Sequence, residues 1–312
     1  MKRLGAAAAA AVLACGFSLP CGFPLAHAED FSPNTGWEAG ARWWGSRGKT
    51  QWSHDGHGAD PSLGNPASVL VYDKLDAQSL EVFGGKRWHE GWSVSGSLGG
   101  GTIHHGMLSD SDYLAGQVKS SETNSSITDG DLAYATLDGG YDFWRPAWRT
   151  SLGALLGLSY WNERVVASGL SSVVPAGAPG LPNDVALITS DVKWYSIRLG
   201  LAGRAQIGDS LNLSATLAAV PYTRMRNDDS HWLRGDLGPT PNVTMDGHGY
   251  GAQLDAEARY TIFKSTDLGL GVRYWKLKTT TGNVQFGGGP SLPLNEFQSS
   301  RYGATVSLVT RW

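Results

Sequence analysis

Two pairs of side chains in this 312-residue chain have the types and spacing needed for hydrolysis. Asp110 and Asp112 are separated by one serine, and so are Asp229 and His231. Residues i and i+2 of a strand share one face, so the members of each pair point the same way. A histidine oriented by a carboxylate can take a proton from water near neutral pH. Two close carboxylates resist double ionisation, so one can keep a proton and polarise a carbonyl. The same patterns also occur in solvated acidic loops, which is the alternative interpretation.

Long runs of alternating residues must position these pairs. The most regular run has polar residues such as Asp255 and Arg259 in its gaps, and its apolar members are Tyr250, Ala252, Leu254, Ala256, Ala258, Tyr260 and Ile262. Similar runs begin at Trp148, Lys193, Leu211 and Tyr302, and the run from Tyr302 ends on Trp312. Soluble strands are usually about 5 or 6 residues long, whereas tilted membrane-spanning strands need about 9 to 11 with aromatic flanks. The runs therefore predict strands that cross a bilayer.

Ten such strands are predicted, an even number as bacterial barrels require. They lie near residues 36–47, 67–85, 91–103, 128–143, 147–163, 187–204, 210–227, 248–263, 266–280 and 300–312. A membrane tolerates no open sheet edge, so the ring must close. We predict an all-β fold, a ten-stranded antiparallel transmembrane β-barrel with long extracellular loops, expected to be a monomer. Both chemical pairs follow predicted strand ends on the long-loop side.

The N-terminus has the pattern of a secretory signal. Lys2 and Arg3 precede a long apolar stretch, and Ala26-His27-Ala28 is a small-x-small cleavage pattern. We expect residues 1–28 to be a signal peptide and residues 29–312 to form one outer-membrane barrel domain; an uncleaved anchor is the alternative. Both cysteines, Cys15 and Cys21, lie in the predicted signal.

The net charge and the remaining motifs argue against nucleic-acid, phosphate-loop and metal-binding functions. The net charge of −3 offers no electrostatic basis for a nucleic-acid partner. The segment Gly45–Thr50 ends like a phosphate loop, but Trp43 stands where the first glycine belongs and no helix pattern follows. The histidines at 54, 57, 104 and 105 lack a second cluster with metal-ligand spacing and are interpreted as loop residues. No metal and no cofactor are expected.

The motifs together resemble those of the omptins, ten-stranded outer-membrane endopeptidases. Asp110 to Tyr113 is similar to the family's Asp-x-Asp-aromatic segment after the third strand, and Asp229 to Trp232 to its Asp-x-His-aromatic segment after the seventh. Tyr-Trp-Asn-Glu-Arg at 160–164 resembles Tyr-Gln-Glu-Ser-Arg on the family's fifth strand. The order, spacing and length correspond over nearly the whole chain.

The resemblance implies a peptide hydrolase of the outer membrane with its active site facing the cell exterior. Asp229 and His231 would activate the attacking water, and Asp110 and Asp112 would bind or polarise on the opposite side. Peptide or protein substrates are the implied partners. Omptins also depend on lipopolysaccharide, which Tyr160, Arg164 and Lys193 would bind here. Tyr160 and Arg164 are alternatively an interfacial aromatic residue and a snorkelling cation.

Two departures from the family pattern concern specificity. Omptins that cut beside basic residues carry acids where this chain aligns Trp52 and Asn227. Asp228 cannot replace them, because its parity turns it away from Asn227 and Asp229. The substrate-binding positions are therefore uncharged, unless Glu38 or Asp55 enters the pocket.

A second function class remains open from the sequence. The chain could be a non-enzymatic outer-membrane barrel that acts as an adhesin or a structural protein, because one scaffold carries many functions. The intact set of three aspartates and one histidine favours the enzyme.

Overall fold

A computed structural model describes residues 35–147 and 149–312 of the chain. Their strands are β1 (Gly36–His54), β2 (Ser68–Arg87), β3 (Trp92–Leu114), β4 (Val118–Ala147), β5 (Thr150–Val174), β6 (Leu181–Ile207), β7 (Leu211–His231), β8 (Val243–Phe263), β9 (Thr266–Phe286) and β10 (Ser291–Arg311). One short 3₁₀ helix, η1 (Gly235–Leu237), lies between β7 and β8. The predicted signal peptide and Trp148 lie outside the described residues.

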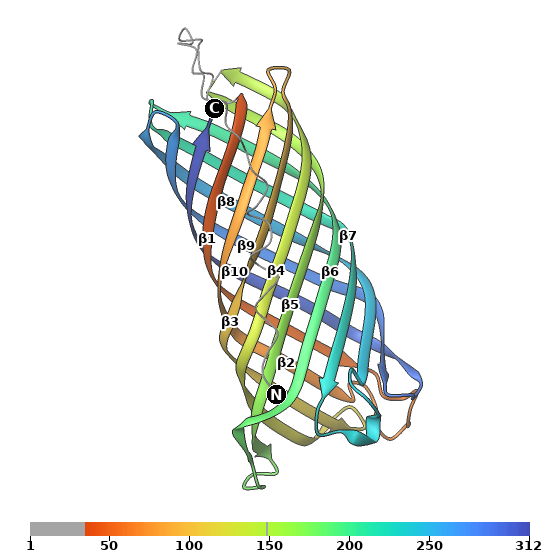
Figure 1. The fold of residues 1–312 in the computed structure, drawn as a ribbon. Coiled ribbons are helices and arrows are strands. Elements are labelled where there is room, and N and C mark those ends of the chain that lie inside the picture. The colour runs from red at the N-terminus through yellow and green to blue at the C-terminus, as the bar shows by residue number, and fades with distance from the viewer. Residues whose placement is uncertain (1–34, 148) are drawn as a thin grey trace. The chain divides into compact units, whose positions relative to one another are not determined.

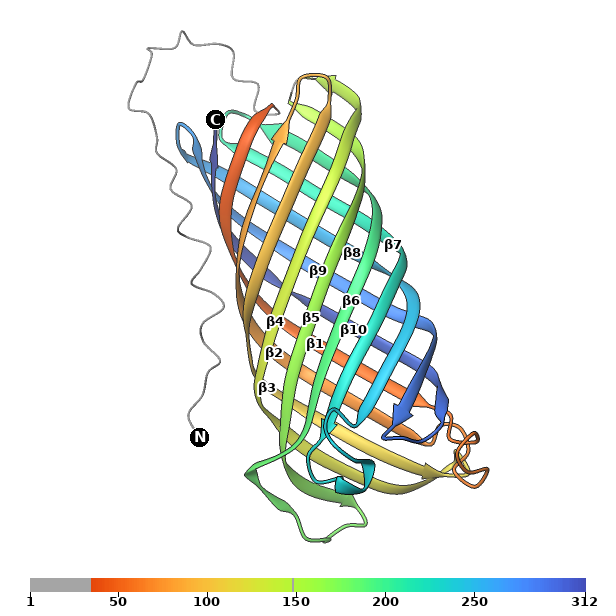
Figure 2. The same ribbon diagram turned by 45° about the vertical axis from the view of Figure 1, so that its right-hand side comes forward.

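The strands form a closed antiparallel barrel in chain order, as the sequence predicts. Closure pairs β1 with β10, and Trp37 and Trp312 exchange backbone hydrogen bonds of 2.8 and 3.0 Å at one end. We call this the terminal end. The connections β1–β2, β5–β6 and β7–β8 gather at the opposite end, which we call the loop end (Figures 1 and 2). Among the described residues, no helix is long and apolar enough to cross a membrane.

The outer face carries an apolar belt between two aromatic girdles. Leu158, Leu199 and Leu217 are typical belt residues, and each has 47% or more of its surface exposed. The girdle nearer the loop end places a tyrosine on each of β5 to β10: Tyr160, Tyr195, Tyr222, Tyr250, Tyr274 and Tyr302. The girdle nearer the terminal end includes Trp92, Tyr260 and Trp312. This pattern is that of a transmembrane barrel surface.

The strands continue well past the predicted boundaries. The sequence predicts strand ends near Ile103 and Asn227, whereas β3 reaches Leu114 and β7 reaches His231. The two chemical pairs consequently lie within strands, not beyond them. The gap between the predicted strands 147–163 and 187–204 shrinks to residues 175–180, because β5 and β6 pair far beyond the belt. Only the connections at 55–67 and 232–242 stay long.

Irregularities in pairing separate the belt from the loop end. Along β7 the odd-numbered Leu217 is exposed in the belt, but the odd-numbered Met225 is fully buried. The pairing of β7 with β8 shifts between Val220 and Thr223, so the strand gains an extra residue there. Along β3 the exposed Leu98 and the buried Leu108 show the same inversion. Such β-bulges exchange inward and outward parity, and here they turn the chemical pairs into the lumen.

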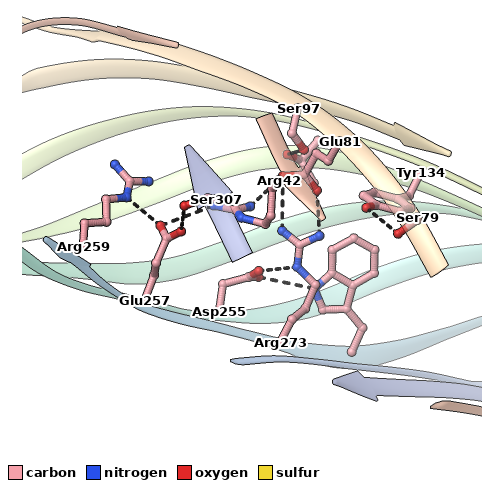
Figure 3. Close-up of polar contacts among 12 residues, drawn as sticks. Arg42, Ser79, Glu81, Ser97, Tyr134, Asp255, Glu257, Arg259, Arg273 and Ser307 are labelled. Atoms are coloured by element: carbon pink, nitrogen blue, oxygen red, sulfur yellow. Dashed lines mark hydrogen bonds and ion pairs between the residues drawn. The ribbon is translucent and has the colours of Figure 1, made fainter. Parts of the chain in front are cut away.

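Paired charges line the lumen within the belt. Arg273 donates to Glu81 at 2.7 Å and to Asp255, and Arg42 donates to the same Glu81 at 2.6 Å (Figure 3). Arg259 pairs with Glu257 at 2.6 Å. The sequence places Asp255 and Arg259 on the polar face of one strand, and the structure turns that face inward. The paired charges line a cavity of about 210 Å³.

Candidate active site

The β7 half of the site is built around a buried carboxylate. Asn227 and Asp229 are both fully buried, and the Asn227 amide donates to Asp229 Oδ1 at 2.7 Å. Ser190 on β6 donates in turn to the Asn227 Oδ1 at 3.1 Å. The His231 side chain is half-buried one step further toward the rim, and its backbone N–H donates to Asn242 Oδ1 at 2.8 Å. Amide and hydroxyl groups therefore hold Asp229 in one orientation beside His231.

The β3 half lies across the loop end. Asp110 is half-buried and Asp112 is exposed. Asp112 is opposite Ser68 on β2, whose hydroxyl donates to Asp112 Oδ1 at 2.6 Å. Asp110 is opposite Leu70, which is itself opposite Trp52 on β1. Both carboxylates thus sit on the inner wall of the same end of the barrel as Asp229 and His231.

The electrostatics show that the two halves converge. Burial, followed by the charges of Asp112 and Asp229, raises the pKa of Asp110 to about 7. Burial also raises the pKa of Asp229 to about 7, against the hydrogen bond from Asn227. Burial and the Arg234 guanidinium lower the pKa of His231 to about 4, whereas Asp112 raises it. At neutral pH the imidazole is therefore a free base, and Asp110 and Asp229 are each about half protonated.

Several buried polar atoms at this end have no hydrogen-bond partner among the described residues. They are Trp52 Nε1, His54 Nδ1, the Tyr72 hydroxyl, Asp110 Oδ1, Asp229 Oδ2 and His231 Nε2. A buried polar group left unpaired costs about 1–3 kcal/mol. No hydrogen bond joins Asp229 to His231 here, although catalytic hydrogen bonds are often long before substrate binds. The cluster is thus arranged to accept water or a substrate.

Tyr72 and His54 are members of this wall that the sequence analysis did not identify as site residues. Tyr72 is fully buried on β2, and burial raises its pKa well above the usual value, with Asp229 and Asp110 adding to the rise. His54 was interpreted as a loop residue, but it ends β1 with 5% of its surface exposed. The sequence contained one signal for this position: His54 follows Trp52 by two residues, and residues so spaced on a strand share a face. Among the described residues, no three possible ligands group to hold a metal ion.

The two predicted substrate-binding residues, Trp52 and Asn227, are buried in the inner wall of the site. Trp52 is 1% exposed, and Asn227 contacts both Asp229 and the Met245 sulfur, the latter at 3.7 Å. Glu38 cannot serve as the missing acid, because it pairs with Arg259 near the terminal end. Asp55 is at the rim, where it accepts hydrogen bonds from His57 and Asn65. The structure also turns Asp228 outward, as predicted from its parity, to lie 3.7 Å from Lys193.

The three predicted lipopolysaccharide-binding residues share one outer patch on β5 and β6. Tyr160 packs on Tyr195 with ring centroids 5.3 Å apart. Lys193 Nζ is 2.7 Å from Asp191, and Arg164 is 3.7 Å from Asp131. Both cations therefore already have acidic neighbours, which a bound phosphate would have to outcompete.

Comparison with known proteins identifies a similar fold. No protein-family model and no curated protein sequence matches the chain. Among solved structures, the outer membrane protease OmpT from Escherichia coli is similar over 89% of this chain and 97% of its own, with 12% identity and a TM-score of 0.72. The translocator domain of the autotransporter NalP from Neisseria meningitidis covers 89% of each chain with 11% identity, but its TM-score is only 0.38.

The fold class follows from this likeness and from the strand order. The chain has the ten-stranded barrel fold of an omptin outer-membrane protease, and the resemblance predicted from its motifs is confirmed at the level of fold. An identity of 12% transfers the architecture and not the activity.

Proposed function

We propose that the chain is an omptin-like outer-membrane endopeptidase that hydrolyses peptide bonds at the cell surface with an activated water. The observation that carries the proposal is the meeting of two pairs, Asp110 with Asp112 and Asp229 with His231, at one end of the barrel. Strands far apart in the sheet supply them, and both pairs keep unpartnered buried atoms. A purely structural role would favour pairing these groups.

The chemistry assigns a step to each pair. Neutral His231 takes a proton from water, and the resulting hydroxide attacks the scissile carbonyl. Ionised Asp229 stabilises the imidazolium, which then protonates the leaving amine as the C–N bond breaks. Asp110 and Asp112 bind the substrate on the side opposite Asp229 and His231, and protonated Asp110 polarises the scissile carbonyl. The proposed mechanism is thus of the aspartyl type, without a covalent intermediate.

The outer surface supports a position in the bacterial outer membrane. The apolar belt and its girdles fit a bilayer, and the terminal end carries the short turns that belong on the periplasmic side. The site would then face the cell exterior. We propose a monomer whose activity requires lipopolysaccharide bound at Tyr160, Arg164 and Lys193.

Substrate choice follows from the uncharged positions. A basic side chain in a partly dry pocket needs a carboxylate, since an unpaired buried charge costs several kcal/mol. Asn227 offers only an amide, and Trp52 an indole ring worth about 0.5–2 kcal/mol as a cation–π partner. We therefore propose that apolar or polar residues are accepted beside the scissile bond.

The test is cleavage of a diverse peptide library by the purified barrel in lipopolysaccharide-containing vesicles, read by mass spectrometry. Specific cuts by the wild type that disappear in His231→Ala support the proposal. A barrel that cuts nothing supports the alternative, an adhesin or structural protein. Omitting lipopolysaccharide, and comparing Arg164→Ala with the wild type, tests the lipid requirement.

A further inference from the structure

His54 occupies the inner wall between the two catalytic halves. Its ring packs between two aromatic neighbours, with centroids 5.9 Å from Trp52 and 5.0 Å from Phe286. The ring Nδ1 is fully buried and has no hydrogen-bond partner among the described residues. Packing thus fixes the plane of the ring and leaves Nδ1 without a hydrogen-bond partner.

The position of His54 in the sheet connects it to the catalytic acids. His54 is opposite Ser68 on β2, and Ser68 is opposite Asp112 on β3. The three residues form one row across neighbouring strands, with the Ser68 hydroxyl bonded to Asp112 at 2.6 Å. The Asp112 charge acts on both His54 and His231. Asp112 therefore lies within electrostatic reach of two imidazoles from opposite walls.

His54 is a neutral side chain at neutral pH. Burial lowers its pKa to about 4, against the charges of Asp112 and Asp55. At neutral pH the ring is neutral and carries one N–H donor. A neutral imidazole N–H in a buried wall can stabilise negative charge that develops on a carbonyl oxygen.

Peptide hydrolysis creates a need for such a donor. Attack of hydroxide turns the carbonyl oxygen into an oxyanion, which the ionised carboxylates at this end would repel. We propose that His54 donates its ring N–H to the carbonyl oxygen of the scissile bond and so forms part of an oxyanion hole. This inference rests on the proposed endopeptidase function. His54 keeps its proton throughout, since the proton taken from water passes through His231 to the leaving amine.

Two substitutions separate hydrogen bonding from packing. His54→Phe retains a ring between Trp52 and Phe286 but removes the donor, whereas His54→Gln keeps an N–H and loses the ring. Loss of one oxyanion donor typically lowers kcat about 10²- to 10³-fold. We expect His54→Phe to lose about 10²-fold in kcat with KM nearly unchanged, and His54→Gln to recover part of that loss.

The experiment measures kcat and KM for a cleaved peptide, together with binding of its tetrahedral phosphinate analogue. The analogue should bind His54→Phe more weakly by about the factor lost in kcat/KM, while heat-modifiable gel migration stays native. Wild-type kcat in His54→Phe, or His54→Gln no better than His54→Phe, would overturn the inference. A wild type that cleaves nothing would instead remove the proposed function, and this inference with it.

Discussion

The belt and the loop end of the lumen both concentrate charged side chains, but they treat them in opposite ways. In the belt, Arg273 bonds Glu81 and Asp255, and its guanidinium stacks 4.9 Å from the Trp275 ring. At the loop end, Asp229 and His231 each keep a buried atom without a partner. Pairing stabilises a fold, whereas unpaired groups cost stability and are retained where chemistry needs them. The comparison separates structural charges from candidate catalytic ones.

The largest expected effect comes from removing the base at the loop end. His231→Ala should lower kcat/KM by at least about 10²- to 10⁴-fold, the usual contribution of general base catalysis. Asp110→Ala and Asp112→Ala should also impair cleavage in a continuous peptide assay. Asp228→Ala is the matched control, because that side chain points outward. Equal activity of the wild type and His231→Ala would assign the loop end to binding.

The next effect concerns the belt and should leave the chemistry intact. Arg273→Met leaves Asp255 without its ion-pair partner. The free energy of unfolding should fall by about 3–5 kcal/mol, as it does when one partner of a buried pair is removed. The midpoint of heat-modifiable migration should fall, while kcat per folded molecule stays at the wild-type value. Arg47→Met is the control, because Arg47 pairs with Asp76 on the exposed surface, where such a pair is worth about 0–1 kcal/mol. Equal effects of both substitutions would contradict the comparison.

Replacing the amide of Asn227 by a carboxylate should change substrate specificity. Asn227→Asp adds a carboxylate and should raise the preference for Arg or Lys over apolar residues beside the scissile bond about tenfold. Overall kcat should fall, because Asp229 loses the amide that donates to it at 2.7 Å. The library profile measures both effects. Strong selection for Arg or Lys by the unmodified protein would show that another acid acts, with Asp55 as the candidate.

The last expected effect is a pH-dependent loss of stability caused by the raised pKa of Asp110. The pKa of Asp110 is about 7 in the folded chain and about 3.9 in an unfolded one. Its folded pKa is raised, so its contribution to stability is present below about pH 4 and is lost as the pH rises through 7. Asp110→Asn should therefore raise the free energy of unfolding at pH 8, by up to about 4 kcal/mol, and much less at pH 4. A gain that does not depend on pH would argue against the raised pKa.

The alternation of residue types was enough to predict the barrel and the members of each chemical pair. Alternation over more than ten residues, as from Tyr250 to Ile262, can satisfy only a strand with one apolar and one polar face. The spacing of Asp229 and His231 fixed that they share a face, and it fixed that Asp228 does not. These properties depend only on residues close together in the chain, so they can be predicted without knowledge of the fold.

Whether each pair faces the lumen, and which residues lie beside it, depends on strand pairing and could not be predicted from the alternation. Extending the belt's parity along β7 would turn Asp229 outward, and the extra residue between Val220 and Thr223 reverses this. A bulge leaves no clear mark in the hydrophobic pattern, because it depends on pairing with both neighbouring strands. Pairing of β1 and β3 with β2 places His54 and Asp112 in one row, and closure of the ring brings β7 to the same mouth. Contacts between residues far apart in the chain arise from this closure, and the local spacing of side chains contains no information about it.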